Sequence, residues 1–141
     1  MKITICASST FQKQILEYEQ LLNALGHEAI VHPDYGWYIR WELPEIVALI
    51  KKEHAAAKRK YGYIKRRHDA IVHSDAILVL NFDKNNIPHY IGCNTLMEMG
   101  FAYVADKKIF LLHPLPDQPY IHDELHTMDI TVIDGDLSLI A

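Results

Sequence analysis

The sequence predicts an α/β protein in which a five-stranded parallel sheet lies between two layers of helices. Short apolar runs rich in β-branched residues alternate along the chain with segments of helical periodicity. This alternation is typical of parallel strands joined by right-handed helical crossovers. One run, residues 75–82, is apolar almost throughout, as expected of a strand buried on both faces in the middle of a sheet.

Five segments are the predicted strands. They are residues 2–7, 28–32, 75–82, 108–113 and 130–133. With helices between them, their order suits a three-layer sandwich of the flavodoxin-like or Rossmann-like kind.

The first predicted helix follows the first strand. Its apolar residues recur at spacings of four and three and form one helical face: Phe11, Ile15, Tyr18, Leu22 and Leu25. Ser9 and Gln12 match a capping box at its start. Gly26 is well placed to end it.

Three further helices are predicted from the same periodicity. A long pattern runs from Glu45 to Ile71, with a break expected at Gly62. Another helix is expected over residues 95–106, and a short one near residues 120–126.

Length and composition bound the class of protein. The 141 residues make one domain, residues 1–141, of which 50% are hydrophobic and 23% charged, so disorder is not expected. No run reaches the roughly 18 apolar residues of a membrane helix. Two cysteines without metal spacing favour a reduced, cytoplasmic setting. His122 and His126 have metal-ligand spacing but no third ligand, so no metal site is expected.

The charge of the chain is unevenly distributed. The net charge is −4, yet eight of the fourteen basic residues lie between residues 51 and 67. Such a segment could meet phosphate or nucleic acid. A solvated helix face is the favoured interpretation, because the rest of the chain is acidic and has no nucleic-acid motif. Nucleic acid is therefore not an expected partner.

The predicted topology indicates where a ligand would bind. In open parallel sheets, ligands bind outside the carboxyl ends of the strands, where the strand order reverses. The loops expected there are residues 7–10 and 81–95. They carry polar residues that could bind a phosphate or sugar hydroxyls, and cap or turn roles explain the same residues equally well. These candidate binding residues are Ser8, Ser9, Asn81, Asp83 and Asn94.

Glu98 is the first candidate for chemistry. It falls in the segment YIGCNTLMEMGFA, residues 90–102, in the first turn of a helix that would begin at the ligand crevice. Thr95-x-x-Glu98 also matches a capping box. From periodicity alone, capping and catalysis are equally good explanations of this glutamate.

The run Glu98-Met99-Gly100-Phe101-Ala102 resembles the Glu-x-Gly-x-Ala signature of the nucleoside 2-deoxyribosyltransferase superfamily. The strands on either side match in kind and order. Members include transferases that exchange bases between deoxyribosides, and hydrolases that cut the N-glycosidic bond of deoxynucleoside monophosphates. The resemblance implies that Glu98 is a nucleophile, that no metal or organic cofactor is needed, and that the protein is a homodimer or larger assembly. Its expected partner is a small nucleoside or nucleotide.

Two positions depart from the pattern of the transferases. Gly92 stands six residues before Glu98, where they often carry an Asp. Arg67 stands eight before Asp75, where they carry an acidic residue. A one-position helical shift would bring His68 or Asp69 to the site, where either could protonate a leaving base, and Asp69 is the candidate catalytic residue of the two. A surface position near a helix end is the favoured interpretation of Asp69, so the general acid stays unassigned.

Two functions follow from these residues. The leading expectation is cleavage of the N-glycosidic bond of a (deoxy)nucleoside or nucleoside monophosphate, with hydrolysis or base transfer. The alternative is a catalytically inactive nucleotide-binding or sensing module of the same fold. The aromatic segment 35–41 could stack on a base or pack against a partner subunit.

Overall fold

The computed structural model describes residues 1–31, 52, 55, 59 and 62–141. Its single described sheet has five strands, all parallel, in the order β2-β1-β3-β4-β5. The strands are β1 (Lys2–Cys6), β2 (Glu28–Ile30), β3 (Ala76–Val79), β4 (Lys108–Leu111) and β5 (Ile130–Val132). The predicted α/β fold with a five-stranded parallel sheet is confirmed, although each strand is shorter than its apolar run.

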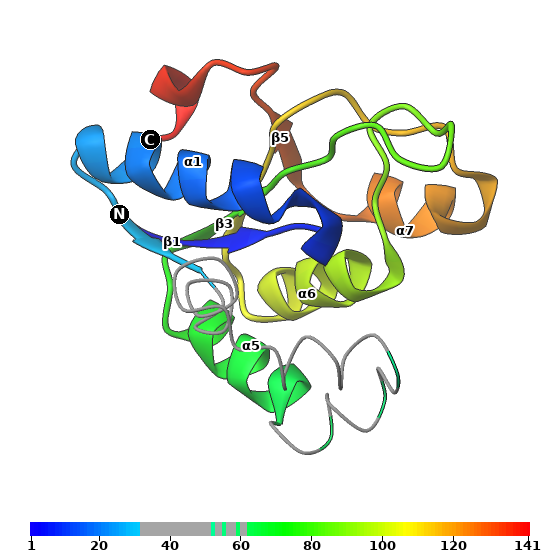
Figure 1. The fold of residues 1–141 in the computed structure, drawn as a ribbon, viewed down its shortest axis with the longest axis horizontal. Coiled ribbons are helices and arrows are strands. Elements are labelled where there is room, and N and C mark those ends of the chain that lie inside the picture. The colour runs from blue at the N-terminus through cyan, green and yellow to red at the C-terminus, as the bar shows by residue number, and fades with distance from the viewer. Residues whose placement is uncertain (32–51, 53–54, 56–58, 60–61) are drawn as a thin grey trace.

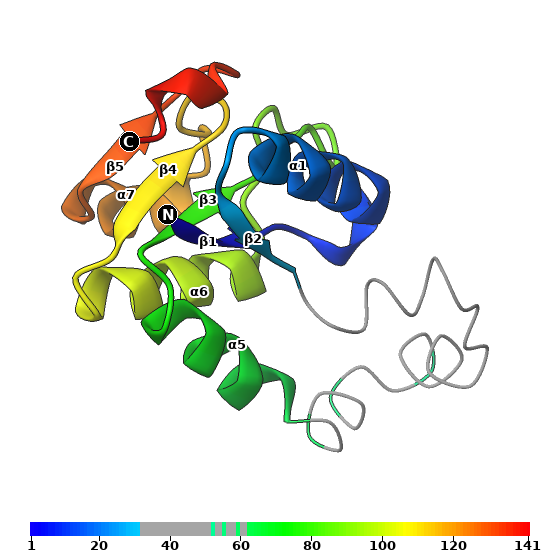
Figure 2. The same ribbon diagram turned by 90° about the vertical axis from the view of Figure 1, so that its left-hand side faces the viewer.

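Helices cover both faces of the sheet (Figures 1 and 2). The helix α1 (Gln12–Ala24) lies on one face, whereas α5 (Tyr63–Val72) and α6 (Cys93–Val104) lie side by side on the other. The short helix α7 (His122–Thr127) follows β4. Three 3-10 turns complete the described elements: η1 (Ser9–Phe11), η2 (Pro119–Ile121) and η3 (Leu137–Leu139).

Two apolar cores separate the three layers. On one side, Ile15 and Leu22 of α1 pack on the strand residues that point toward them, including Ile5. On the other side, Ile71 of α5 and Met99 of α6 pack on the alternate strand residues. Since successive side chains of a strand point to opposite faces, each inner strand contributes to both cores. This explains why β3 is buried along its whole length.

The strand order reverses between β1 and β3. The chain leaves β1 toward β2 on one side and returns through α5 to β3 on the other. The loops that follow β1 and β3 therefore run to opposite faces and diverge at the carboxyl edge of the sheet. This is the order expected for a flavodoxin-like sandwich, and it places the predicted crevice at the ends of these two strands.

Glycines lie just after the end of α1, as predicted, and just before the start of α5, where the sequence predicts a break. Gly26 has φ +85° just after α1, and Gly62 has φ +60° just before α5. Both values lie in the left-handed region that glycine adopts without strain. The part of the predicted helix before Gly62, and the aromatic segment 35–41, lie outside the described residues apart from positions 52, 55 and 59.

The predicted capping box at Ser9 is wrong. The turn η1 precedes α1, so Phe11 occupies the N-cap position of α1 and makes no side-chain cap. Ser8 caps η1 instead, accepting a hydrogen bond from the Thr10 amide at 3.4 Å. Among the described residues, no helix is long and apolar enough to cross a membrane.

Candidate functional site

The helix that carries Glu98 begins earlier than predicted. Its first residue is Cys93, preceded by Gly92 in an extended conformation, and Leu96 N–H donates to the Gly92 carbonyl at 2.9 Å. Glu98 therefore lies in the second turn. Gly92 occupies the N-cap position, where no side-chain cap forms, so the capping-box interpretation of Thr95 and Glu98 is wrong.

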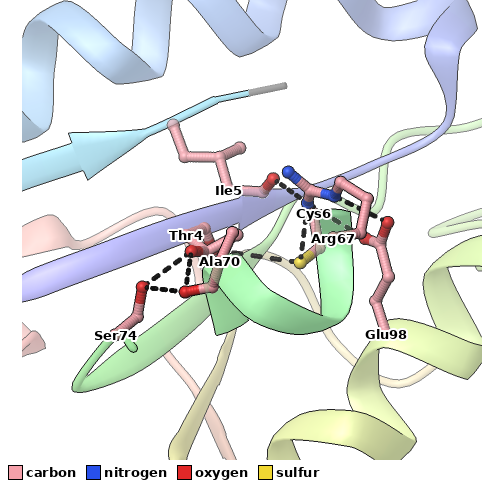
Figure 3. A network of polar contacts seen from close by, with 7 residues as sticks. All are labelled: Thr4, Ile5, Cys6, Arg67, Ala70, Ser74 and Glu98. Carbon is pink, nitrogen blue, oxygen red and sulfur yellow. Dashed lines mark hydrogen bonds and ion pairs between the residues drawn. The ribbon is translucent and has the colours of Figure 1, made fainter. Parts of the chain in front are cut away.

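The Glu98 carboxylate is buried and forms an ion pair with Arg67 (Figure 3). Arg67 Nε donates to Oε1 at 2.9 Å, and Arg67 Nη2 donates to Oε2 at 3.1 Å. Arg67 is 8% exposed and Glu98 is 9% exposed. Two parallel bonds to one carboxylate hold both its position and its plane. The pair joins α5 to α6.

Arg67 also anchors this pair to the end of β1. Its Nη2 donates to the Ile5 carbonyl at 2.8 Å and lies 3.3 Å from Cys6 Sγ (Figure 3). Burial raises the pKa of the Cys6 thiol well above its ordinary value, and the negative charge of Glu98 adds to the rise. Cys6 is the last residue of β1, so the Glu98 carboxylate lies at the carboxyl edge of the sheet, as the topology predicts.

A second set of hydrogen bonds holds α5 against β1. Thr4 Oγ1 and Ser74 Oγ are 2.8 Å apart, and Ser74 Oγ donates to the Ala70 carbonyl at 2.8 Å (Figure 3). Arg67, Ala70 and Ser74 recur at spacings of three and four, so they share one side of the helix and its C-terminal extension. Because this side faces β1, the packing of α5 determines which residue reaches Glu98.

The structure does not bring Asp69 to Glu98. Asp69 follows Arg67 by two residues, so its side chain leaves the helix about 200° around the axis from that of Arg67. The Asp69 side chain is 71% exposed. Its carboxylate lies 3.4 Å from Nδ1 of His68, whose ring contacts Phe101 edge-on. The one-position shift that would bring Asp69 to the site does not occur, and Asp69 lies at the surface, the alternative that the sequence favoured. Arg67 itself occupies the position.

Ser8 faces a lysine that the sequence analysis missed. Lys84 Nζ donates to Ser8 Oγ at 2.9 Å and lies 5.5 Å from the centre of the Tyr90 ring. This contact joins the loop after β1 to the loop after β3. Ser9, in contrast, is exposed at the surface.

A tight hairpin holds Lys84 in place. Lys84 and Ile87 exchange backbone hydrogen bonds at 3.1 and 2.9 Å, and Asn85 and Asn86 between them have φ of +52° and +58°. Two positive φ angles define the type I′ turn, in which asparagine is common. The adjacent asparagines in the sequence therefore indicate this hairpin.

Asn81 has a structural role that its sequence position did not reveal. It is fully buried, its Oδ1 accepts from the His113 amide at 2.8 Å, and its Nδ2 donates to the carbonyls of His113 and Pro114 at 3.1 and 3.0 Å. Both ends of the amide therefore bind the loop after β4. These bonds agree with the structural role that the sequence left open for Asn81, and sugar binding by this residue stays a prediction.

The other two predicted binding residues lie at the surface. Asp83 Oδ1 accepts from the His89 amide at 3.0 Å, which supports the loop after β3. Asn94 is the second residue of α6 and is exposed. Neither contacts the Glu98 carboxylate through a hydrogen bond in the described part of the chain.

Among the described residues, no group of three His, Cys, Asp or Glu side chains could hold a metal ion. The His122 and His126 rings stack 4.0 Å apart, with His126 Nδ1 on the His122 carbonyl. A hollow of about 540 Å³ near Lys108 and Asp129 lies at the opposite edge of the sheet and contains none of the predicted site residues.

The fold and the site together define an α/β sandwich with a buried carboxylate at the carboxyl edge of its sheet. No family model matches the chain, and no curated protein matches it either. Among solved structures, the chain is similar to the CMP N-glycosidase BcmB of Clostridium botulinum, with 18% sequence identity and a TM-score of 0.56. The match covers 94% of this chain and 88% of that one. The two proteins share a fold, and this confirms the fold implied by the resemblance to nucleoside 2-deoxyribosyltransferases.

Proposed function

We propose that this protein cleaves the N-glycosidic bond of a (deoxy)nucleoside or nucleoside monophosphate, with Glu98 as the nucleophile. The observation that carries the proposal is the buried Glu98 carboxylate, held at the carboxyl end of β1 by Arg67. Its place at the strand reversal of a fold shared with a CMP N-glycosidase supports the same conclusion.

The chemistry requires an anion at this place. Breaking the bond between C1′ and the base builds positive charge on the sugar, which a buried carboxylate stabilises or captures. Glu98 forms a bond to C1′ as the base leaves with the former bonding pair and takes a proton from water. A water molecule then attacks C1′, the ester bond to Glu98 breaks, and a proton returns to solvent.

No acidic side chain is assigned to protonate the departing base. Arg67 occupies the position where the transferases carry an acid, and Asp69 points away from Glu98. Base transfer requires the base to be held and exchanged, whereas hydrolysis requires only water. Hydrolysis is therefore the proposed reaction, and a homodimer in which a neighbouring subunit completes the site is the proposed assembly.

We infer that Ser8 and Lys84 bind a phosphate group at the carboxyl edge of the sheet. Ser8 lies two residues beyond Cys6, which spans at most about 7 Å of chain, and Lys84 Nζ is within hydrogen-bond distance of its hydroxyl. A lysine ammonium and a serine hydroxyl are both donors for phosphate oxygens. Nucleoside monophosphates are the proposed preferred substrates.

A nucleotide-binding or sensing module is the second candidate function. The observation that favours it is that both oxygens of Glu98 already accept hydrogen bonds from Arg67. A carboxylate engaged in this way is a weaker nucleophile. In such a protein the pair would serve only to hold α5 against α6.

One experiment separates the two functions. The protein is incubated with a panel of deoxynucleosides, ribonucleosides and their monophosphates, and free base is measured by chromatography. An enzyme releases base from some of them and loses that activity in Glu98→Ala, while Glu124→Ala, a change at an exposed glutamate of α7, retains it. Saturable binding without base release, unchanged in Glu98→Ala, would establish the sensing module instead.

A further inference from the structure

The guanidinium of Arg67 is fixed on three sides. Its Nε and Nη2 hold the two oxygens of Glu98, and Nη2 also contacts the Ile5 carbonyl and Cys6 Sγ (Figure 3). The Thr4 and Ser74 contacts fix the helix that carries it. The cation therefore stays beside the carboxylate without any rearrangement of the chain.

The charge on Glu98 changes during the proposed reaction. The carboxylate carries a full negative charge at rest, loses it when its oxygen bonds to C1′, and regains it when that bond breaks. A buried cation stabilises the anionic form more strongly than it would in water. Arg67 therefore opposes the first step and favours the second.

We propose that Arg67 is a positioning residue that makes Glu98 a good leaving group and so speeds hydrolysis of the glycosyl-enzyme. The inference rests on the proposed function. In the step concerned, the water oxygen bonds to C1′ and the bond between C1′ and a Glu98 oxygen breaks. Its electron pair returns to the carboxylate, and the proton of the water goes to solvent. Arg67 remains protonated throughout, and no other reactant is needed.

The orientation of the two side chains supports this role. Nε and Nη2 each donate to a different oxygen, so the oxygen that bonds to C1′ keeps its partner while the other oxygen becomes the ester carbonyl. A fork of two parallel donors is a property of arginine, whereas lysine supplies a single point charge. Arg67→Lys therefore keeps the positive charge but removes the pair of parallel hydrogen bonds to the carboxylate.

The test is rapid-quench measurement of base release during the first turnover, with intact-mass analysis of the quenched protein. Substrates are the nucleosides or monophosphates that the wild-type protein cleaves. The variants are Arg67→Gln and Arg67→Lys. Arg66→Gln is the matched control, because Arg66 is the neighbouring arginine of α5 and is exposed.

In the wild type and in Arg66→Gln, base release is linear from the first turnover and no sugar adduct is detected. In Arg67→Gln, the ratio of first-turnover rate to steady-state rate rises about tenfold or more, the effect of losing charge-assisted hydrogen bonds. A burst of up to one base per protein then appears, and the mass increases by one sugar unit. Arg67→Lys gives a smaller burst. If Arg67→Gln does not fold, the burst in Arg67→Lys is the test of the inference.

Two results overturn the inference in different ways. If the wild type cleaves its substrate but the Arg67 variants slow both phases equally and form no adduct, Arg67 is only a structural residue and the proposed function stands. If the wild type releases no base from any substrate, the proposed function fails, and the role of Arg67 fails with it.

Discussion

Arg67 of α5 donates hydrogen bonds to both carboxylate oxygens of Glu98 of α6, at 2.9 and 3.1 Å, and both residues are buried. Breaking a buried ion pair by removing one partner leaves an uncompensated charge, which costs more than removing both. The pair therefore contributes to stability as a unit. Its two members should not act independently.

The first prediction concerns this coupling. Arg67→Met is expected to lower the free energy of unfolding by about 3–5 kcal/mol, measured by urea denaturation, because Glu98 is left buried without the guanidinium. The double variant Arg67→Met/Glu98→Gln should recover part of that loss. Strictly additive effects in this double-mutant cycle would show that the two side chains do not stabilise each other.

The second prediction concerns phosphate recognition by Lys84. Lys84→Met retains the aliphatic stem and removes the donor to Ser8, so the preference for a monophosphate over its nucleoside should fall about tenfold, the effect of one charge-assisted hydrogen bond. The measurement is kcat/KM for each pair of substrates. Lys107→Met, at the opposite edge of the sheet, is the matched control. If Lys84→Met and Lys107→Met show the same preference for the monophosphate, Lys84 does not bind the phosphate.

The third prediction concerns alkaline pH. The pKa of the Cys6 thiol is raised above its ordinary value of 9.0, first by burial and then by Glu98. Above that pH the unfolded chain loses the proton while the folded protein keeps it, so the unfolded state binds fewer protons and stability falls as pH rises. The contribution is fully present below pH 9.0.

Comparison with Cys6→Ala isolates this effect from other titrations. Denaturation at a series of pH values should show the wild type losing more stability than Cys6→Ala as the pH rises above the ordinary pKa of the thiol. Parallel curves would contradict the raised pKa. Alkylation under native conditions should modify the exposed Cys93 and spare the buried Cys6.

The sheet could be predicted from the sequence because its signals are local. The continuous apolar run that contains β3 and the helical spacing of α1 each depend on a few neighbouring residues. The start of α6 was misplaced because the extended conformation of Gly92 lets the helix begin at Cys93. A search for Ser or Thr caps in the sequence does not detect a helix that begins after an extended glycine without a side-chain cap.

The partner of Glu98 could not be predicted in the same way. Arg67 is distant in the chain, and which residue of α5 reaches Glu98 depends on how Thr4 and Ser74 fasten that helix to β1. The role of Asn81 likewise depends on the loop after β4, which approaches it only in the folded protein. These contacts are set by tertiary packing.

The most direct measurement of the central claim is a crystal structure of the Glu98→Gln variant with a nucleoside monophosphate bound. The substituted side chain should lie about 3–3.5 Å from C1′ of the sugar, the separation expected of a near-attack arrangement. The phosphate should lie toward Ser8 and Lys84. A sugar bound away from position 98, with the side chain still closed against Arg67, would contradict the assignment of Glu98 as nucleophile.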